Sequence, residues 1–192
     1  MEDGEEKRRR GEEQMKKEIR TVVYDEELRI EAYRFEGIVQ PFPNHFHEYY
    51  VIGFIEGGER RLICRSREYE IRRGDILLFN PGDSHACVQS DGEVFDYRGF
   101  NLSKEVMKKL AEELTGKKEL PGFSENVIHD TEAVCYVRPL HEMVMEGCVE
   151  FGKEENLLLL LGLLIQRYGQ PFEECIPECG AEIERACSFM EQ

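Results

Sequence analysis

Three histidines of this chain are spaced so that a small β-barrel would bring them together. His45 and His47 stand two residues apart, and His85 follows a Pro-Gly turn further along the sequence. In an extended strand, residues two apart point to the same face, so the first two imidazoles project together. A different strand supplies the third. The pattern predicts one interior pocket that holds three nitrogen ligands or three polar contacts.

Three interpretations of this cluster stay open at the level of sequence. The imidazoles of His45, His47 and His85 bind a divalent metal ion, because this spacing suits a three-histidine site. Alternatively, they contact an organic effector in a metal-free pocket, together with Tyr49. In the third interpretation they are partly buried histidines whose polar atoms are satisfied by ordinary hydrogen bonds.

Three arginines lie on neighbouring predicted strands and bear on the charge of such a ligand. If the side chains of Arg61, Arg65 and Arg98 turn into the barrel, they lend positive charge to an anionic effector. The alternative is that they face solvent, since arginine is mostly exposed in folded proteins.

The segment 19–101 is predicted to form the barrel that carries these residues. Short runs rich in Val, Ile, Phe and Tyr alternate there with Gly, Asn, Asp and Pro. Many short strands at this spacing are typical of a sandwich or barrel rather than of alternating β and α units. The predicted strands are Leu28–Phe35, Tyr49–Ile55, Arg60–Arg65, Glu68–Ile71, Ile76–Phe79, Ala86–Gln89 and Val94–Phe100.

The segment 102–169 changes to a helical pattern. Ser103 is the predicted N-cap of a helix over Lys104–Leu114, and two further helices are predicted over Thr131–Gly147 and Lys153–Tyr168. The last helix is apolar almost all round, so it must be covered on more than one side. It is either an ordinary core helix or one that packs against a second subunit. For the second case the predicted dimer interface is Leu157, Leu160, Leu161 and Leu164.

The ends of the chain have a different texture. Residues 1–18 are nearly all charged, which predicts a solvated tail. Residues 170–180 contain prolines and glycines typical of a linker. An amphipathic helical pattern then begins over 181–192, and we expect it to be the start of a second, truncated domain.

Charge and cysteine content restrict the class of protein. The net charge of −15 makes the chain a poor nucleic-acid binder by itself, because phosphate binding needs clustered Lys and Arg. The odd count of seven cysteines and the lack of a secretory signal favour free thiols in a reducing cytoplasm. The one close pair, Cys175 and Cys179, is interpreted as ordinary loop cysteines. No apolar run approaches the roughly 18 residues of a membrane-spanning helix, so no membrane contact is expected.

Two sequence blocks resemble the cupin superfamily, and in particular the N-terminal sensing domain of AraC-type bacterial transcription regulators. The first block is Pro43–Tyr50 followed by Gly53–Gly57, and the second is Arg72–His85. The resemblance extends over about 21–192. It implies a mainly β fold, a cupin-type antiparallel β-barrel (double-stranded β-helix or jelly roll), followed by two to three α-helices. It also implies a small-molecule effector inside the barrel, a homodimer, and DNA binding through a C-terminal helix-turn-helix domain.

One departure from the enzyme-like cupin pattern counts against catalysis. Metal-dependent cupins typically place a Glu three or four residues after the paired histidines, where this chain has Val51 and Ile52. Glu48 is adjacent to His47, so a regular strand would turn it to the opposite face. Without that carboxylate, zinc or nickel suits the site better than iron. The alternative functions are a stand-alone metal-dependent cupin enzyme, an isomerase or dioxygenase, and a barrel that only dimerises.

Overall fold

The computed structural model describes residues 18–89, 94–148 and 152–173. Most of the predicted charged tail, the predicted helix over 181–192, and both Cys175 and Cys179 lie outside the described residues.

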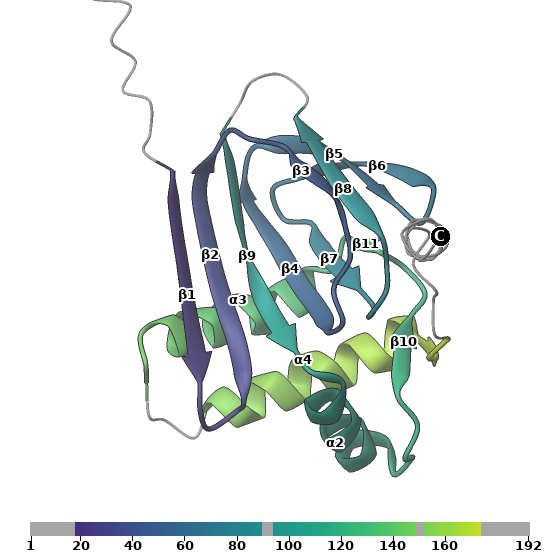
Figure 1. Cartoon of the computed structure of the whole chain (residues 1–192). Helices are drawn as coiled ribbons and strands as arrows, with labels where there is room; N and C mark the ends of the chain where they lie inside the picture. The colour runs from purple at the N-terminus through teal and green to yellow at the C-terminus, as the bar shows by residue number, and fades with distance from the viewer. Residues whose placement is uncertain (1–17, 90–93, 149–151, 174–192) are drawn as a thin grey trace, which may run out of the picture.

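Two antiparallel sheets face each other and form the barrel (Figure 1). The larger has the strand order β1-β2-β9-β4-β7-β11, and the smaller has the order β3-β8-β5-β6. The predicted antiparallel barrel followed by helices is therefore confirmed. The strands are β1 Ile19–Asp25, β2 Ile30–Ile38, β3 Phe42–His45, β4 Tyr50–Gly57, β5 Glu59–Cys64, β6 Arg67–Arg72, β7 Ile76–Phe79, β8 His85–Gln89, β9 Phe95–Leu102 and β11 Val127–Ile128.

The two faces of the larger sheet belong to two different apolar clusters. Successive side chains of a strand point to opposite faces. Ala32 of β2 and Phe100 of β9 accordingly pack with the helices, whereas Tyr33 and the half-buried Tyr97 of the same strands pack inside the barrel. This alternation separates a helix-covered core from the interior in which the candidate site lies.

Helices α3 (Thr131–Met145) and α4 (Gly152–Tyr168) cover the outer face of the larger sheet, and α2 (Lys104–Thr115) packs beside α4 (Figure 1). Helix α2 begins at the predicted N-cap, Ser103, whose side chain accepts a hydrogen bond from the Val106 amide. Helices α3 and α4 lie where the sequence predicts them. Among the described residues, no helix is both long and apolar enough to span a membrane.

Short strands that the sequence did not predict connect the helices to the barrel. β10 (Pro121–Phe123) pairs with β12 (Gly169–Pro171), so the start of the predicted linker is part of a sheet. Strand β1 was also missed. It is an edge strand whose side chains are mostly exposed, and it therefore lacks the strongly apolar pattern of a buried strand.

The predicted dimer interface on α4 is wrong. Leu157, Leu160, Leu161 and Leu164 are each at most 1% exposed and belong to the core formed with the sheet and the other helices of the same chain. Side chains that one chain already covers cannot contact a second copy. The sequence pattern showed correctly that α4 needs cover on several sides, but neighbouring elements of this chain provide it.

Two adjacent leucines of α4 give a direct test. We expect Leu160→Ala to lower the free energy of unfolding by about 2–5 kcal/mol, because it leaves a cavity in a filled core. Leu159 is 46% exposed, so Leu159→Ala is expected to cost less than about 1 kcal/mol. Urea unfolding of both variants measures the difference. Equal losses would contradict the assignment of Leu160 to the core of the single chain.

Candidate functional site

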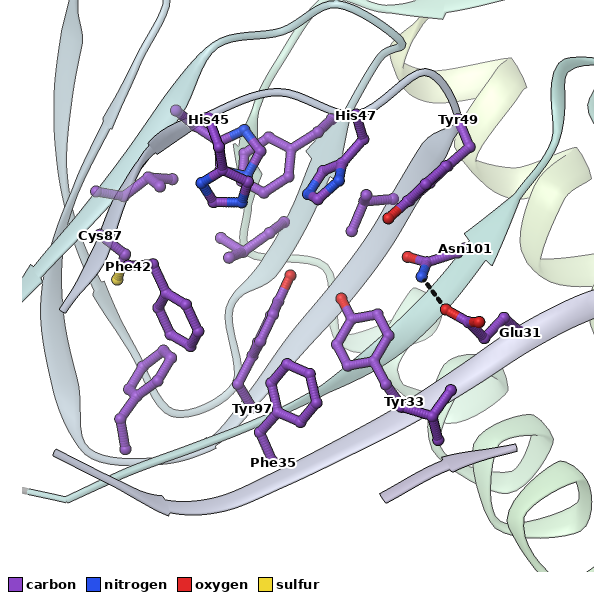
Figure 2. Close-up of a pocket in the computed structure, with 17 residues that line it drawn as sticks. Glu31, Tyr33, Phe35, Phe42, His45, His47, Tyr49, Cys87, Tyr97 and Asn101 are labelled. Carbon is purple, nitrogen blue, oxygen red and sulfur yellow. Dashed lines mark hydrogen bonds between the residues drawn. The ribbon is translucent and has the colours of Figure 1, made fainter. Parts of the chain in front are cut away.

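A cavity of about 240 Å³ lies inside the barrel, between the two sheets. Figure 2 shows 17 lining residues, most of them aromatic or aliphatic, with a few polar groups among them. Such a cavity, mostly apolar with a few placed polar groups, is the usual form of a small-molecule site. The lining residues are Val22, Glu31, Tyr33, Phe35, Phe42, His45, His47, Tyr49, Val51, Leu62, Leu77, Phe79, His85, Cys87, Phe95, Tyr97 and Asn101.

The three predicted histidines meet on one side of this pocket. The ring centroids of His45 and His85 are 4.4 Å apart, and those of His45 and His47 are 4.9 Å apart. One candidate ligand nitrogen from each ring lies within 4.8 Å of the others. Strand β3 ends at His45, which is the register partner of His85 on β8. His47 lies beyond the end of β3, so strand alternation alone does not explain how its ring reaches the cluster.

Backbone carbonyl groups orient two of the rings. His45 Nδ1 lies 2.6 Å from the Pro43 carbonyl oxygen, and His85 Nδ1 lies 2.9 Å from that of Asp83. A ring that donates from Nδ1 offers Nε2 to a ligand. Burial lowers the pKa of His47 and of His85 to about 4, with a further lowering from the charge on neighbouring imidazoles. Both rings are therefore neutral at pH 7.

A buried carboxylate fixes the turn that presents His85. Asp83 is 1% exposed, and its Oδ2 accepts hydrogen bonds from the backbone amide of Asn80 at 3.0 Å and from the side-chain amide of Asn126 at 3.1 Å. Arg65 Nε lies 3.5 Å from the other carboxylate oxygen. Asn80 also exchanges two hydrogen bonds with the backbone of Phe123. The position of His85 is thus tied to the segment that precedes α3.

Two tyrosines extend into the pocket above a pair of glycines. Gly53 of β4 and Gly99 of β9 are register partners in the larger sheet. A Cβ atom on Gly53 would lie 2.2 Å from the Tyr97 hydroxyl oxygen, and one on Gly99 would lie 2.5 Å from that of Tyr33. The absence of both side chains therefore makes room for the two phenol groups. Burial raises the pKa of each tyrosine, so both hydroxyls are protonated donors.

Sequence reasoning missed the polar groups contributed by β2 and β9. Asn101 Nδ2 donates to Glu31 Oε1 at 2.5 Å, and both residues line the pocket. Alternation along β2, in which Glu31, Tyr33 and Phe35 share a face, was the signal that could have found them. The sequence pattern could not show which of the two faces was the interior.

Comparison with known proteins agrees with this architecture. The family model described as "AraC-like ligand binding domain" matches residues 27–165. The chain belongs to this family. It is also 46% identical over 179 residues to the "Uncharacterized HTH-type transcriptional regulator YbfI" of Bacillus subtilis (strain 168). That alignment covers 93% of this chain and 65% of the relative, so the chain spans about two-thirds of the relative's length.

Solved structures give weaker matches to this AraC-like domain. DMSP lyase DddQ from Ruegeria pomeroyi is 20% identical with a TM-score of 0.40, over 48% of this chain and 50% of that chain. A cupin superfamily protein from Desulfitobacterium hafniense is 12% identical with a TM-score of 0.40, over 46% and 79% of the two chains. At these scores neither match says anything about the chemistry of the AraC-like domain.

The three predicted effector-binding arginines do not line the pocket of the AraC-like domain. Arg61 lies between two inward-facing residues of β5 and is exposed beside Glu68. Arg65 follows the end of β5 with a φ of 49° and lies beside Asp83. Arg98 of β9 shares the face of Phe100, which is the helix-covered face of the sheet. Strand parity thus turns Arg61 and Arg98 away from the interior, so of the two alternatives open at the level of sequence, the one in which they lend positive charge to an effector is not supported.

The neutral imidazoles make the stability of the AraC-like domain depend on pH. His85 protonates near pH 6.5 in the unfolded chain but only near pH 4 in the folded one, so the unfolded state binds more protons between these values. The free energy of unfolding should therefore fall as the solution is acidified, by about 2 kcal/mol from His85 between pH 7.5 and 5.0. Urea unfolding at several pH values, on the wild type and His85→Gln, measures this. Parallel pH profiles for the two proteins would show that His85 contributes nothing.

Proposed function

We propose that this chain is the effector-sensing part of an AraC-type transcription regulator, and that the pocket between the sheets is its effector site. The observation that carries this proposal is the 240 Å³ cavity with its few convergent polar groups. The family to which the chain belongs, the AraC-like ligand binding domain, supports the same function. His45, His47, Tyr49 and His85 are the proposed effector contacts on one side. Tyr33, Tyr97, Glu31 and Asn101 also line the pocket and are further proposed contacts.

An effector changes the state of a regulator only when it binds one arrangement of the domain more tightly than another. The hydrogen bonds of Asp83 provide a route for that difference. They connect the turn before His85 to Asn126, while Asn80 connects it to Phe123 of β10. β10 in turn pairs with β12, which follows α4. We propose that a ligand touching His85 acts on the end of α4 through these contacts.

The homodimer, DNA binding through a C-terminal helix-turn-helix domain, a cytoplasmic location and the absence of enzymatic activity all belong to this proposal. The relationship to a protein described as an HTH-type regulator supports them. Because the leucine-rich face of α4 is buried within the chain, we propose that the homodimer forms through another surface.

A reporter assay tests the effector site. The chain is fused to a DNA-binding domain that requires dimerisation, and a panel of small molecules is screened for a transcriptional response. Val22 lines the pocket yet is 54% exposed, so Val22→Trp narrows the cavity with little loss of packing. We expect at least a tenfold weaker response to any active compound. Val39→Trp is the matched control, because Val39 is 46% exposed and lies outside the pocket lining. An unchanged response in Val22→Trp would contradict the proposed site.

The histidine cluster supports a second candidate, a divalent metal site. Three nitrogens within 4.8 Å of one another, with two rings oriented by backbone carbonyls, fit the donor set of a three-histidine centre. Glu48, which follows His47, is exposed, and the Asp83 carboxylate near His85 is engaged by Asn80, Asn126 and Arg65, so zinc or nickel remains a better fit than iron. A bound ion would act as a Lewis acid on a ligand oxygen, and a metal-dependent cupin enzyme would require it.

Elemental analysis of the purified chain decides the second candidate. If the cluster is a metal site, zinc or nickel should be near-stoichiometric in the wild type and fall at least tenfold in His47→Ala. His129→Ala is the matched control, because the His129 side chain is 66% exposed and lies outside the cluster. An equal metal content in all three proteins, high or low, would contradict a metal role for His47.

A further inference from the structure

We propose that the effector is a small single-ring aromatic molecule with a protonated amine, and that the Glu31 carboxylate binds the ammonium group. This inference rests on the proposed function and adds the chemical class of the ligand. It arises from three features of the pocket: its aromatic wall, its charge and its unsatisfied hydrogen-bonding capacity.

The wall of the pocket suits an aromatic ring of limited size. The ring centroids of Tyr33 and Phe35 are 5.1 Å apart, and those of Tyr33 and Tyr97 are 5.3 Å apart, which is the range in which aromatic pairs interact favourably. An apolar cavity of about 150 Å³ is enough to hold benzene. The 240 Å³ here leaves room for a ring and a side chain of a few atoms. The aromatic lining residues are Tyr33, Phe35, Phe42, Tyr49, Phe79, Phe95 and Tyr97.

The charge of the pocket selects a cation. Glu31 is the one acidic side chain among the described lining residues, and that lining contains no Arg or Lys. The Arg20 guanidinium lies 5.4 Å from the centroid of Phe35, but it is ion-paired with Glu18 at 2.6 Å. The buried Arg60 guanidinium lies outside the lining, 5.1 Å from the centroid of Phe95, where it donates to the carbonyl oxygens of Ile38 and Gln40. An anionic ligand beside Glu31 would leave water to meet a like charge. An ammonium ligand would meet an opposite charge and the faces of electron-rich rings.

The hydrogen-bonding groups around Glu31 are incompletely used. The contact with Asn101 engages only Oε1 of the carboxylate, so a ligand ammonium can bind at Oε2. The Tyr33 side chain is only 5% exposed, so its hydroxyl is shielded from solvent. Figure 2 shows this hydroxyl directed into the pocket. Burial raises the pKa of Tyr49, and the Glu31 charge adds to that rise, which places the Tyr49 hydroxyl within the field of the same carboxylate.

Three probes of nearly equal shape and different charge test the inference. All three are phenols with a short side chain opposite the hydroxyl. That side chain ends in an ammonium group in tyramine, a neutral hydroxyl in tyrosol and a carboxylate in 4-hydroxyphenylacetate. Titration calorimetry on the whole chain should show tyramine binding about tenfold more tightly than tyrosol, because a charge-assisted contact exceeds a neutral one. The carboxylate probe should bind more weakly than tyrosol.

Glu31→Gln removes the charge and keeps an oxygen that can accept from Asn101. In this variant the preference for tyramine over tyrosol should disappear while tyrosol affinity stays within about twofold. Glu70→Gln is the control, since Glu70 is exposed on β6 and outside the pocket. It should retain the preference. Thermal unfolding confirms that both variants are folded.

Each other outcome overturns the inference. Tighter binding of 4-hydroxyphenylacetate than of tyramine would show that the pocket binds anions. That result would reject the ammonium ligand but would not contradict the proposed effector site. Equal binding of all three probes, or a preference that survives Glu31→Gln, removes the role of Glu31. No binding of any probe at 5 mM also rejects this ligand class. The proposed function is judged separately, by whether Val22→Trp weakens the response in the reporter assay at least tenfold.

Discussion

The central sheet of this protein is apolar on both faces, and each face has to be removed from water. One set of alternating side chains packs under α3 and α4, and the other set faces the smaller sheet. Because hydrophobic burial is the dominant favourable contribution to folding, the helical layer and the barrel interior both follow from this one requirement. The pocket lies between the two sheets, and a pair of glycines leaves space there for Tyr33 and Tyr97.

Polar contacts connect the barrel interior to the helical layer. A buried carboxylate such as Asp83 is tolerated only when hydrogen bonds and an opposite charge compensate its lost hydration. Asn80, Asn126 and Arg65 provide that compensation from three different segments. Any displacement of the turn before His85 disturbs these contacts, so the pocket and the segment preceding α3 are mechanically linked. In the proposed function, this turn is where occupancy of the pocket is transmitted to the helices.

Several elements were predictable because their signals are local. Ser103 determines the start of α2 through a hydrogen bond three residues away, and β7 (Ile76–Phe79) has the predicted bounds. The three histidines meet as predicted, but His47 reaches the cluster from beyond the end of β3 rather than by strand alternation. Other elements were not predictable in this way. β1 is an exposed edge strand, and β10 and β12 are three-residue strands that exist only as partners of each other.

The sequence by itself determined the helix starts and the bounds of strands such as β7, since each depends on neighbours within a few residues. The tertiary structure decided which face of each element is inside. It placed Arg61, Arg65 and Arg98 outside the pocket, brought Glu31 into it, and covered the leucine-rich face of α4 within the same chain. The physical reason is that periodicity fixes which residues share a face, whereas burial depends on which distant segment packs against that face.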